Sequence, residues 1–147
     1  MPHPDAIRAA LAATQANVLQ TFYDLGVCGP ARTDQAANRN YCGMFKTPTL
    51  RNVATRKAFM HNGVFTDLAD AVRFYAGRDT QSAKWYPRKA NGATDRYNDL
   101  PVEMRGNIDV IDAPLDRSAG ERPALSEAEV QDIVAFLRTL TDADVMN

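Results

Sequence analysis

The stretch from residue 78 to residue 124 places the strongest constraint on the fold, because its apolar residues follow neither the helical nor the strand period. Proline and glycine interrupt it throughout, at Pro87, Gly92, Pro101, Gly106, Pro114, Gly120 and Pro123. Such punctuation prevents a long helix or a central strand. We therefore predict loops with one short helix near residues 102–105; loops of this length are usually functional or packed on a partner.

A well-marked helix is predicted just before this stretch, over residues 67–76. Thr66 is a suitable N-cap, acidic residues fill the first turn, and Gly77 follows as a stop signal. Apolar residues recur at spacings of three, four and three, at Phe65, Leu68, Val72 and Tyr75. This spacing predicts one buried stripe along the helix.

Two further helices are predicted near the ends of the chain. Over residues 126–140, Ser126 and Glu129 form a capping-box pattern, and Leu125 and Val130 are placed for a hydrophobic staple. Over residues 4–20, Pro4 suits the first helical position. The elements together predict a mostly α fold with long loops and little sheet.

The charge balance excludes several kinds of partner. The 147 residues carry 17 basic and 18 acidic side chains, which gives no overall case for nucleic acid or a membrane surface. The length indicates one domain, and no apolar stretch is long enough to span a membrane. Residues 44–66 hold four basic residues and no acidic one, which suits a small anionic ligand; a solvated face is the alternative.

The two cysteines leave two interpretations open. Cys28 and Cys42 have neither the spacing of a CxxC redox motif nor that of a zinc pair, and no CxxCH haem-attachment motif is present. In an oxidising compartment they would form a disulfide, whereas in the cytosol they would be free thiols. The sequence also lacks a Ser-His-Asp set, a glycine-rich phosphate loop and an HExxH motif, so hydrolase and nucleotide-binding functions have no support.

Two side chains with possible ligand chemistry have simpler alternatives. His61 lies between aromatic residues before the turn Asn62-Gly63, where a hydrogen-bonded core histidine is a common outcome. Tyr75 ends the apolar stripe of the predicted helix, so it could be a core tyrosine with its hydroxyl at the rim.

The segment GMFKTPTLRNVATRKAFMHNGVFTDLADAVRFYAGRD, residues 43–79, resembles the C-terminal haem domain of bacterial di-haem cytochrome c peroxidases and MauG-like proteins. Weaker similarity extends it to about residues 22–142. The resemblance implies a partial cytochrome-c-like helical domain. Residues 22–147 would be the C-terminal portion of that haem domain, without its CxxCH, and residues 1–21 would be a helix that does not match the family.

The resemblance implies roles for three residues. His61 corresponds to the family histidine that lines the C-terminal haem site. Tyr75, fourteen residues later, stands where typical peroxidases have a methionine and MauG has a tyrosine as the axial ligand of the haem iron. Arg51 corresponds to an arginine placed to pair with a haem propionate. We expect the three to converge on one open surface that exposes Phe45, Met60 and Phe65.

The resemblance also implies cofactors, partners and a compartment. Haem c is the family cofactor. A family calcium site would use carbonyls near Arg56 and Ala58, but the threonine and proline expected there are absent, which argues against calcium. Expected partners are the missing N-terminal haem domain and an electron donor such as a small cytochrome or cupredoxin. A periplasmic setting implies a Cys28–Cys42 disulfide, although the first residues form no signal peptide.

Two functions follow as alternatives. The chain could be part of a di-haem oxidoreductase that transfers electrons and reduces peroxide in its intact form. It could instead be a haem-free truncated fragment that serves only as a binding or structural module. Without CxxCH, we expect the chain alone to be inactive.

Overall fold

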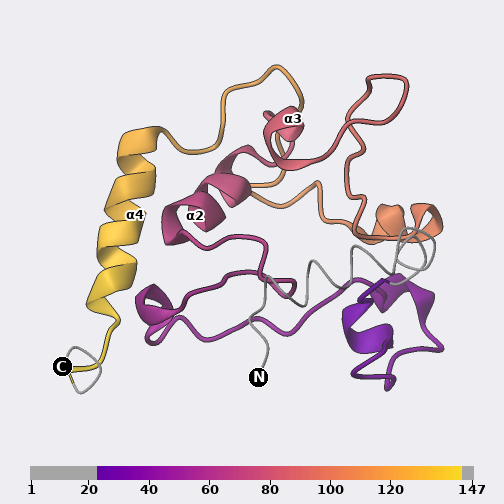
Figure 1. The fold of residues 1–147 in the computed structure, drawn as a ribbon, viewed down its shortest axis with the longest axis horizontal. Helices are drawn as coiled ribbons and strands as arrows, with labels where there is room; N and C mark the ends of the chain where they lie inside the picture. The colour runs from indigo at the N-terminus through magenta and orange to yellow at the C-terminus, as the bar shows by residue number, and fades with distance from the viewer. Residues whose placement is uncertain (1–22, 144–147) are drawn as a thin grey trace, which may run out of the picture.

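The computed structural model describes residues 23–143, so the helix predicted over 4–20 lies outside the described part. In chain order the helical elements are η2 (Gly26–Cys28), η3 (Arg39–Tyr41), η4 (Val53–Thr55), α2 (Leu68–Gly77), α3 (Ser82–Trp85), η5 (Val102–Asn107) and α4 (Glu127–Thr139). Long loops join them (Figure 1). Within residues 23–143 the only β pairing is two isolated bridges, Phe59 with Phe65 and Arg88 with Thr94. The mostly helical class is therefore confirmed, with short helices.

Helix α2 begins one residue later than predicted, at Leu68 rather than at residue 67. Asp67, rather than Thr66, is the N-cap, and its carboxylate accepts a hydrogen bond from the amide of Ala69 at 2.7 Å. Gly77 is the last helical residue rather than a stop beyond the helix. An aspartate cap also adds negative charge at the positive end of the helix dipole, which favours Asp67 over its neighbour.

Helix α4 forms with the expected cap. The Ser126 hydroxyl accepts from the amide of Glu129, and the Glu129 carboxylate accepts from the amide of Ser126 at 2.7 Å. Leu125 packs against the cluster that contains Val130, as the staple requires. The helix ends at Thr139, one residue before the predicted end.

Packing of α2 against α4 forms the hydrophobic core (Figure 1). One cluster joins Ala69 of α2 to Val130 and Val134 of α4. A second joins Ala71 of α2 and Leu137 of α4 to Val53 and Phe59, which precede α2 in the chain. Small alanines on α2 allow the larger side chains of α4 to approach closely.

The long stretch 78–124 is ordered by polar contacts as well as by apolar ones. At its start the buried carboxylate of Asp79 accepts hydrogen bonds from Arg78, Arg96 and Tyr97. Arg78 also donates to the carbonyl of Asp109 at 2.5 Å. A buried carboxylate is stable only with such partners, so this cluster ties three separate parts of the stretch together.

Aromatic rings cover the end of α2. The indole of Trp85 in α3, a short helix that the sequence did not predict, donates to the carbonyl of Gly77 at 3.1 Å. Its ring lies 5.7 Å from those of Phe65 and Phe74. Such edge-to-face contacts stabilise the turn after α2. The short helix expected near 102–105 is present as η5. No helix within residues 23–143 is long and apolar enough to cross a membrane.

The α2–α4 packing predicts unequal effects for two apolar truncations in α4. Val130 is 2% exposed, so Val130→Ala should lower the free energy of unfolding by about 2 kcal/mol. Phe136 is 58% exposed on the same helix, so Phe136→Ala should cost well under about 1 kcal/mol despite removing more atoms. Urea unfolding followed by circular dichroism measures both, and an equal loss in the two variants would contradict this packing.

A salt bridge between the two helices predicts a pH dependence. Arg73 of α2 donates to Glu127 of α4 from Nε at 2.9 Å and Nη2 at 2.5 Å, and this hydrogen bonding lowers the pKa of Glu127 from 4.5 to about 2. An acid with a lowered pKa stabilises the fold above its unfolded pKa, and this contribution is lost as the pH falls through the folded pKa. Wild type should therefore exceed Glu127→Gln in melting temperature at pH 7.

The difference in melting temperature should shrink between pH 4.5 and pH 2 and vanish below it. Asp132→Asn is the matched control, because Asp132 is an exposed α4 acid with no ion-pair partner among residues 23–143. A Glu127→Gln difference that stays constant down to pH 2 would rule out the ionic contribution.

Candidate functional site

Tyr75 occupies the one exposed position of α2. The other nine residues of the helix are buried or half-buried, whereas the Tyr75 side chain is 49% exposed. Its ring contacts that of Phe74 at a centroid distance of 6.2 Å, and its hydroxyl has no hydrogen-bond partner within residues 23–143. The buried stripe therefore ends before Tyr75, and the core-tyrosine alternative is wrong. The phenol is free to meet a group from outside the described chain.

His61 also lies at the surface rather than in the core. His61 is exposed, and its ring packs edge-on against Phe45 with centroids 3.9 Å apart and planes at 69°. Met60 before it has a φ of 67°, and the Asn62 side chain accepts from the amide of Val64 at 3.1 Å. A tight turn thus holds the imidazole next to one aromatic ring.

The guanidinium of Arg51 is engaged at one nitrogen only within residues 23–143. Its Nε donates to the Asp142 carboxylate at 2.8 Å, and its side chain remains 74% exposed. Asn52 binds the same carboxylate through its amide nitrogen at 2.9 Å. The hydrogen bonds from Asn52 and Arg51 lower the pKa of Asp142, so this acid stays ionised opposite the guanidinium. Sequence reasoning missed Asp142, because ninety residues separate it from Asn52 and no local pattern joins them.

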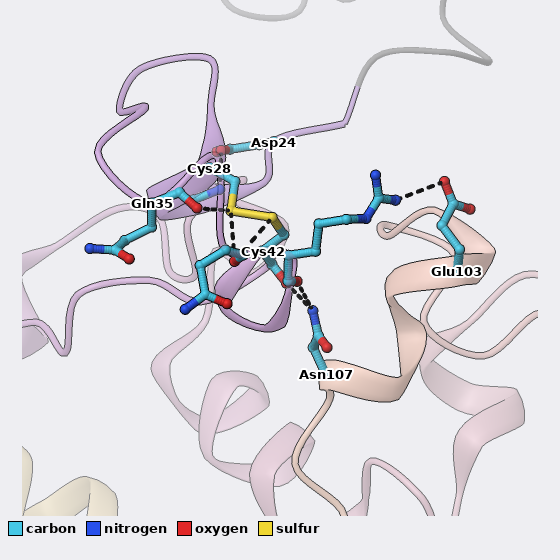
Figure 2. Close-up of a disulfide and its surroundings, with 9 residues drawn as sticks. Asp24, Cys28, Gln35, Cys42, Glu103 and Asn107 are labelled. Atoms are coloured by element: carbon cyan, nitrogen blue, oxygen red, sulfur yellow. Dashed lines mark hydrogen bonds and ion pairs between the residues drawn. A yellow bond between two sulfur atoms is a disulfide. The ribbon is translucent and has the colours of Figure 1, made fainter.

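Cys28 and Cys42 are joined by a disulfide with Cα atoms 5.1 Å apart, the pairing that the resemblance implies (Figure 2). Asn107 of η5 extends this link, since its side-chain amide donates to the carbonyls of Arg39 at 2.8 Å and Cys42 at 2.9 Å. These are the only cysteines of the sequence. Because each sulfur is bonded to the other, neither can form a thioether to a haem.

The disulfide-bonded segment leads directly to the Phe45–His61 contact. Gly26 lies against Met44, and the amide of Val27 donates to the Met44 carbonyl at 3.1 Å. The next residue, Phe45, is the ring that contacts His61. The turn at Gly26 therefore sets the position of the segment that supports the imidazole.

The exposed apolar surface differs from the expected one. Phe45 is 41% exposed, as predicted, but Met60 and Phe65 are partly buried against the core cluster of Val53 and Phe59. The β-bridge between Phe59 and Phe65 places both ends of the turn that contains His61 against this core cluster. The exposed large apolar residues of residues 44–75 are instead Met44, Phe45, Leu50, Val64 and Tyr75.

Arg51, His61 and Tyr75 come from three consecutive elements: the start of the η4 turn, the turn before α2, and α2 itself. Within residues 23–143 they make no hydrogen bond, ion pair or ring contact with one another. Their convergence on one surface therefore stays a prediction. All three are exposed side chains that place a cation, an imidazole and a phenol where another group can reach them.

Comparison with known proteins finds similarity to MauG and to the diheme peroxidase BthA. No family model matches the chain. The methylamine utilization protein MauG of Paracoccus denitrificans is 37% identical over 100 residues, which cover 68% of this chain and 23% of that protein. The chain belongs to the MauG and di-haem peroxidase family. Both its sequence and its structure support this membership.

Two crystal structures of the diheme peroxidase BthA from Burkholderia thailandensis are similar in fold. The first, a tyrosine-to-methionine variant, has a TM-score of 0.74 and 43% identity, and the match covers 91% of this chain and 30% of that one. The second, BthA itself, has a TM-score of 0.74 and 44% identity, with 88% and 30% covered. The chain thus spans less than a third of the length of these relatives.

The close contact between Gly26 and the Met44 backbone yields a prediction with an internal control. A Cβ at Gly26, where φ is +59°, would lie 2.0 Å from the Met44 carbonyl oxygen, so Gly26→Ala should cost more than about 2 kcal/mol of stability. Gly92 has a φ of +82° with nothing within 4 Å, so Gly92→Ala should show the backbone strain alone, about 1 kcal/mol. Thermal unfolding compares the two; equal costs would mean that the contact with Met44 is unimportant.

Proposed function

We propose that this chain supplies one side of a c-type haem site, as the C-terminal haem domain does in an intact di-haem peroxidase or MauG-like oxidoreductase. The intact protein would transfer electrons and reduce peroxide. The observation that supports this most directly is Tyr75, an exposed phenol on a helix whose other apolar residues are buried or half-buried, at the position implied for the axial ligand. The names of the relatives support the same class of chemistry.

If these exposed residues converge on one surface as predicted, their chemistry fits a haem in three respects. A haem supplies an iron that changes oxidation state, and a phenolate oxygen stabilises its ferric form. Tyr75 offers that oxygen, and the exposed apolar side chains of Phe45 and Val64 suit the porphyrin faces. Arg51 offers a cation for a propionate. Covalent attachment would need cysteines outside this sequence, because Cys28 and Cys42 are bonded to each other.

The partners and compartment belong to the same proposal. The remaining length of the relatives would include the N-terminal haem domain, which completes the enzyme. An electron-donor protein, such as a small cytochrome or a cupredoxin, would reduce it. A periplasmic location fits the Cys28–Cys42 disulfide, since such bonds persist in oxidising compartments.

The alternative function is a haem-free binding or structural module. One observation favours it: both cysteines are used in the disulfide, so the chain holds no thiol for haem attachment. A haem titration decides between the two, because a haem-free module has no reason to keep a phenol that binds iron.

We expect the chain to bind added haemin without covalent attachment, with Tyr75 as the axial ligand. Tyr75→Phe removes only the hydroxyl, so it should raise the haemin dissociation constant about tenfold while the melting temperature stays unchanged. Soret absorbance followed during titration measures the affinity. Tyr41→Phe is the matched control, because Tyr41 is an exposed tyrosine at 43% that the resemblance gives no role.

Identical titrations for the wild type and Tyr75→Phe would exclude Tyr75 as a ligand. No saturable haemin binding by the wild type would favour the haem-free module. Haem that stays with the polypeptide after denaturation would show an attachment that the disulfide-bonded cysteines do not allow.

A further inference from the structure

Arg51 and Asn52 form a clamp on the end of α4, here defined as the four hydrogen bonds that join them to Leu140 and Asp142. The amide of Asn52 donates to the carbonyl of Leu140 at 2.9 Å. The Asn52 side chain accepts from the amide of Asp142 at 2.7 Å and donates to its carboxylate at 2.9 Å. Arg51 completes the clamp through Nε at 2.8 Å. Because Arg51 and Asn52 both donate to the Asp142 carboxylate, its orientation is fixed.

The backbone of Asn52 is adapted to this clamp. Its φ of 59° lies in the left-handed region, which asparagine tolerates better than most residues. This conformation lets its amide and its side chain point to the same stretch of chain, residues 140–142. The clamp therefore fixes residues 140–142 relative to Asn52 through backbone groups as well as side chains.

The clamp leaves the outer edge of the Arg51 guanidinium free. A guanidinium can bind two carboxylates, one along the Nε edge and one along the edge formed by its two terminal nitrogens. Asp142 accepts from Nε, and neither terminal nitrogen donates a hydrogen bond within residues 23–143. The side chain is 74% exposed, so this second edge is open.

We propose that Asp142, held by Asn52, is a positioning residue that orients Arg51 so that its two terminal nitrogens bind a carboxylate of the ligand. The inference rests on the proposed function, in which that carboxylate is a haem propionate. Arginine side chains lose rotamer freedom when they bind, so a guanidinium fixed in advance by Asp142 binds more tightly than a free one. Residues 44–66, the sequence neighbours of Arg51, include no acid.

The first experiment needs no haem. In the wild type, the Arg51 Nε proton should exchange slowly with water, and its nuclear magnetic resonance signal should shift when sodium propionate is added. Asp142→Ala should make the exchange as fast as in free arginine and weaken the propionate response. Asp132→Ala removes an exposed α4 acid without a partner and should change neither. Fast exchange in the wild type, or no effect of Asp142→Ala, would overturn the positioning role.

The second experiment measures the propionate contribution as the ratio of affinities for haemin and haemin dimethyl ester, which lacks the carboxylates. We expect a ratio of about tenfold in the wild type, reduced to near one in Arg51→Ala. Asp142→Ala should reduce the ratio to nearly the same extent, and adding it to Arg51→Ala should change nothing further. Asp142→Asn keeps an acceptor oxygen and should restore part of the ratio.

These outcomes separate the two proposals. If the wild type binds haemin but the ratio is the same in Asp142→Ala, the positioning role is wrong and the proposed function stands. If the wild type binds neither compound, the proposed function fails, and the propionate titration alone decides the role of Asp142. Asp142→Asn serves in both experiments should Asp142→Ala fail to fold.

Discussion

The buried carboxylate of Asp79 holds together the part of the molecule that has least regular structure. It lies just beyond α2 and accepts from Arg78, Arg96 and Tyr97, while Arg78 reaches on to the carbonyl of Asp109. Without a sheet or a long helix, the stretch 78–124 has few other ways to satisfy its buried polar groups. Because this carboxylate accepts from two arginines and a tyrosine hydroxyl, it fixes the positions of residues 78, 96 and 97 relative to the end of α2.

This anchoring explains why a single α2 residue remains exposed. One face of α2 packs on α4 through Ala69 and Ala71, and its end is covered by the Trp85 ring and the Asp79 cluster. Tyr75 is the one large apolar residue of α2 that stays exposed. The proposed haem site rests on this exposed phenol, and the ligand class proposed for it comes from the similarity to MauG and BthA.

The sequence predicted the elements whose signals are local and missed those whose partners lie far away. The α4 capping box lies within four residues, so Ser126 and Glu129 could be recognised directly. Tyr75 continued an apolar spacing, but periodicity cannot tell a buried stripe from its exposed end, which depends on α3 and the loop that follow. The link from Asn52 to Asp142 spans ninety residues and requires a left-handed backbone at Asn52, which no composition or spacing shows. Long-range polar contacts of this kind become visible only in three dimensions.

The disulfide has a practical consequence for anyone who prepares this protein. Helices α2 and α4 are held by caps and apolar packing in which neither cysteine takes part, so we expect them to form in the reduced protein as well. The segment that leads from Cys42 to Phe45, and so to His61, depends on the Cys28–Cys42 bond and its Asn107 link. Protein made in a reducing cytosol could therefore show normal helicity and a cooperative melt, yet lack the surface around His61. Free-thiol quantification, rather than circular dichroism, is the appropriate quality check before any ligand-binding assay.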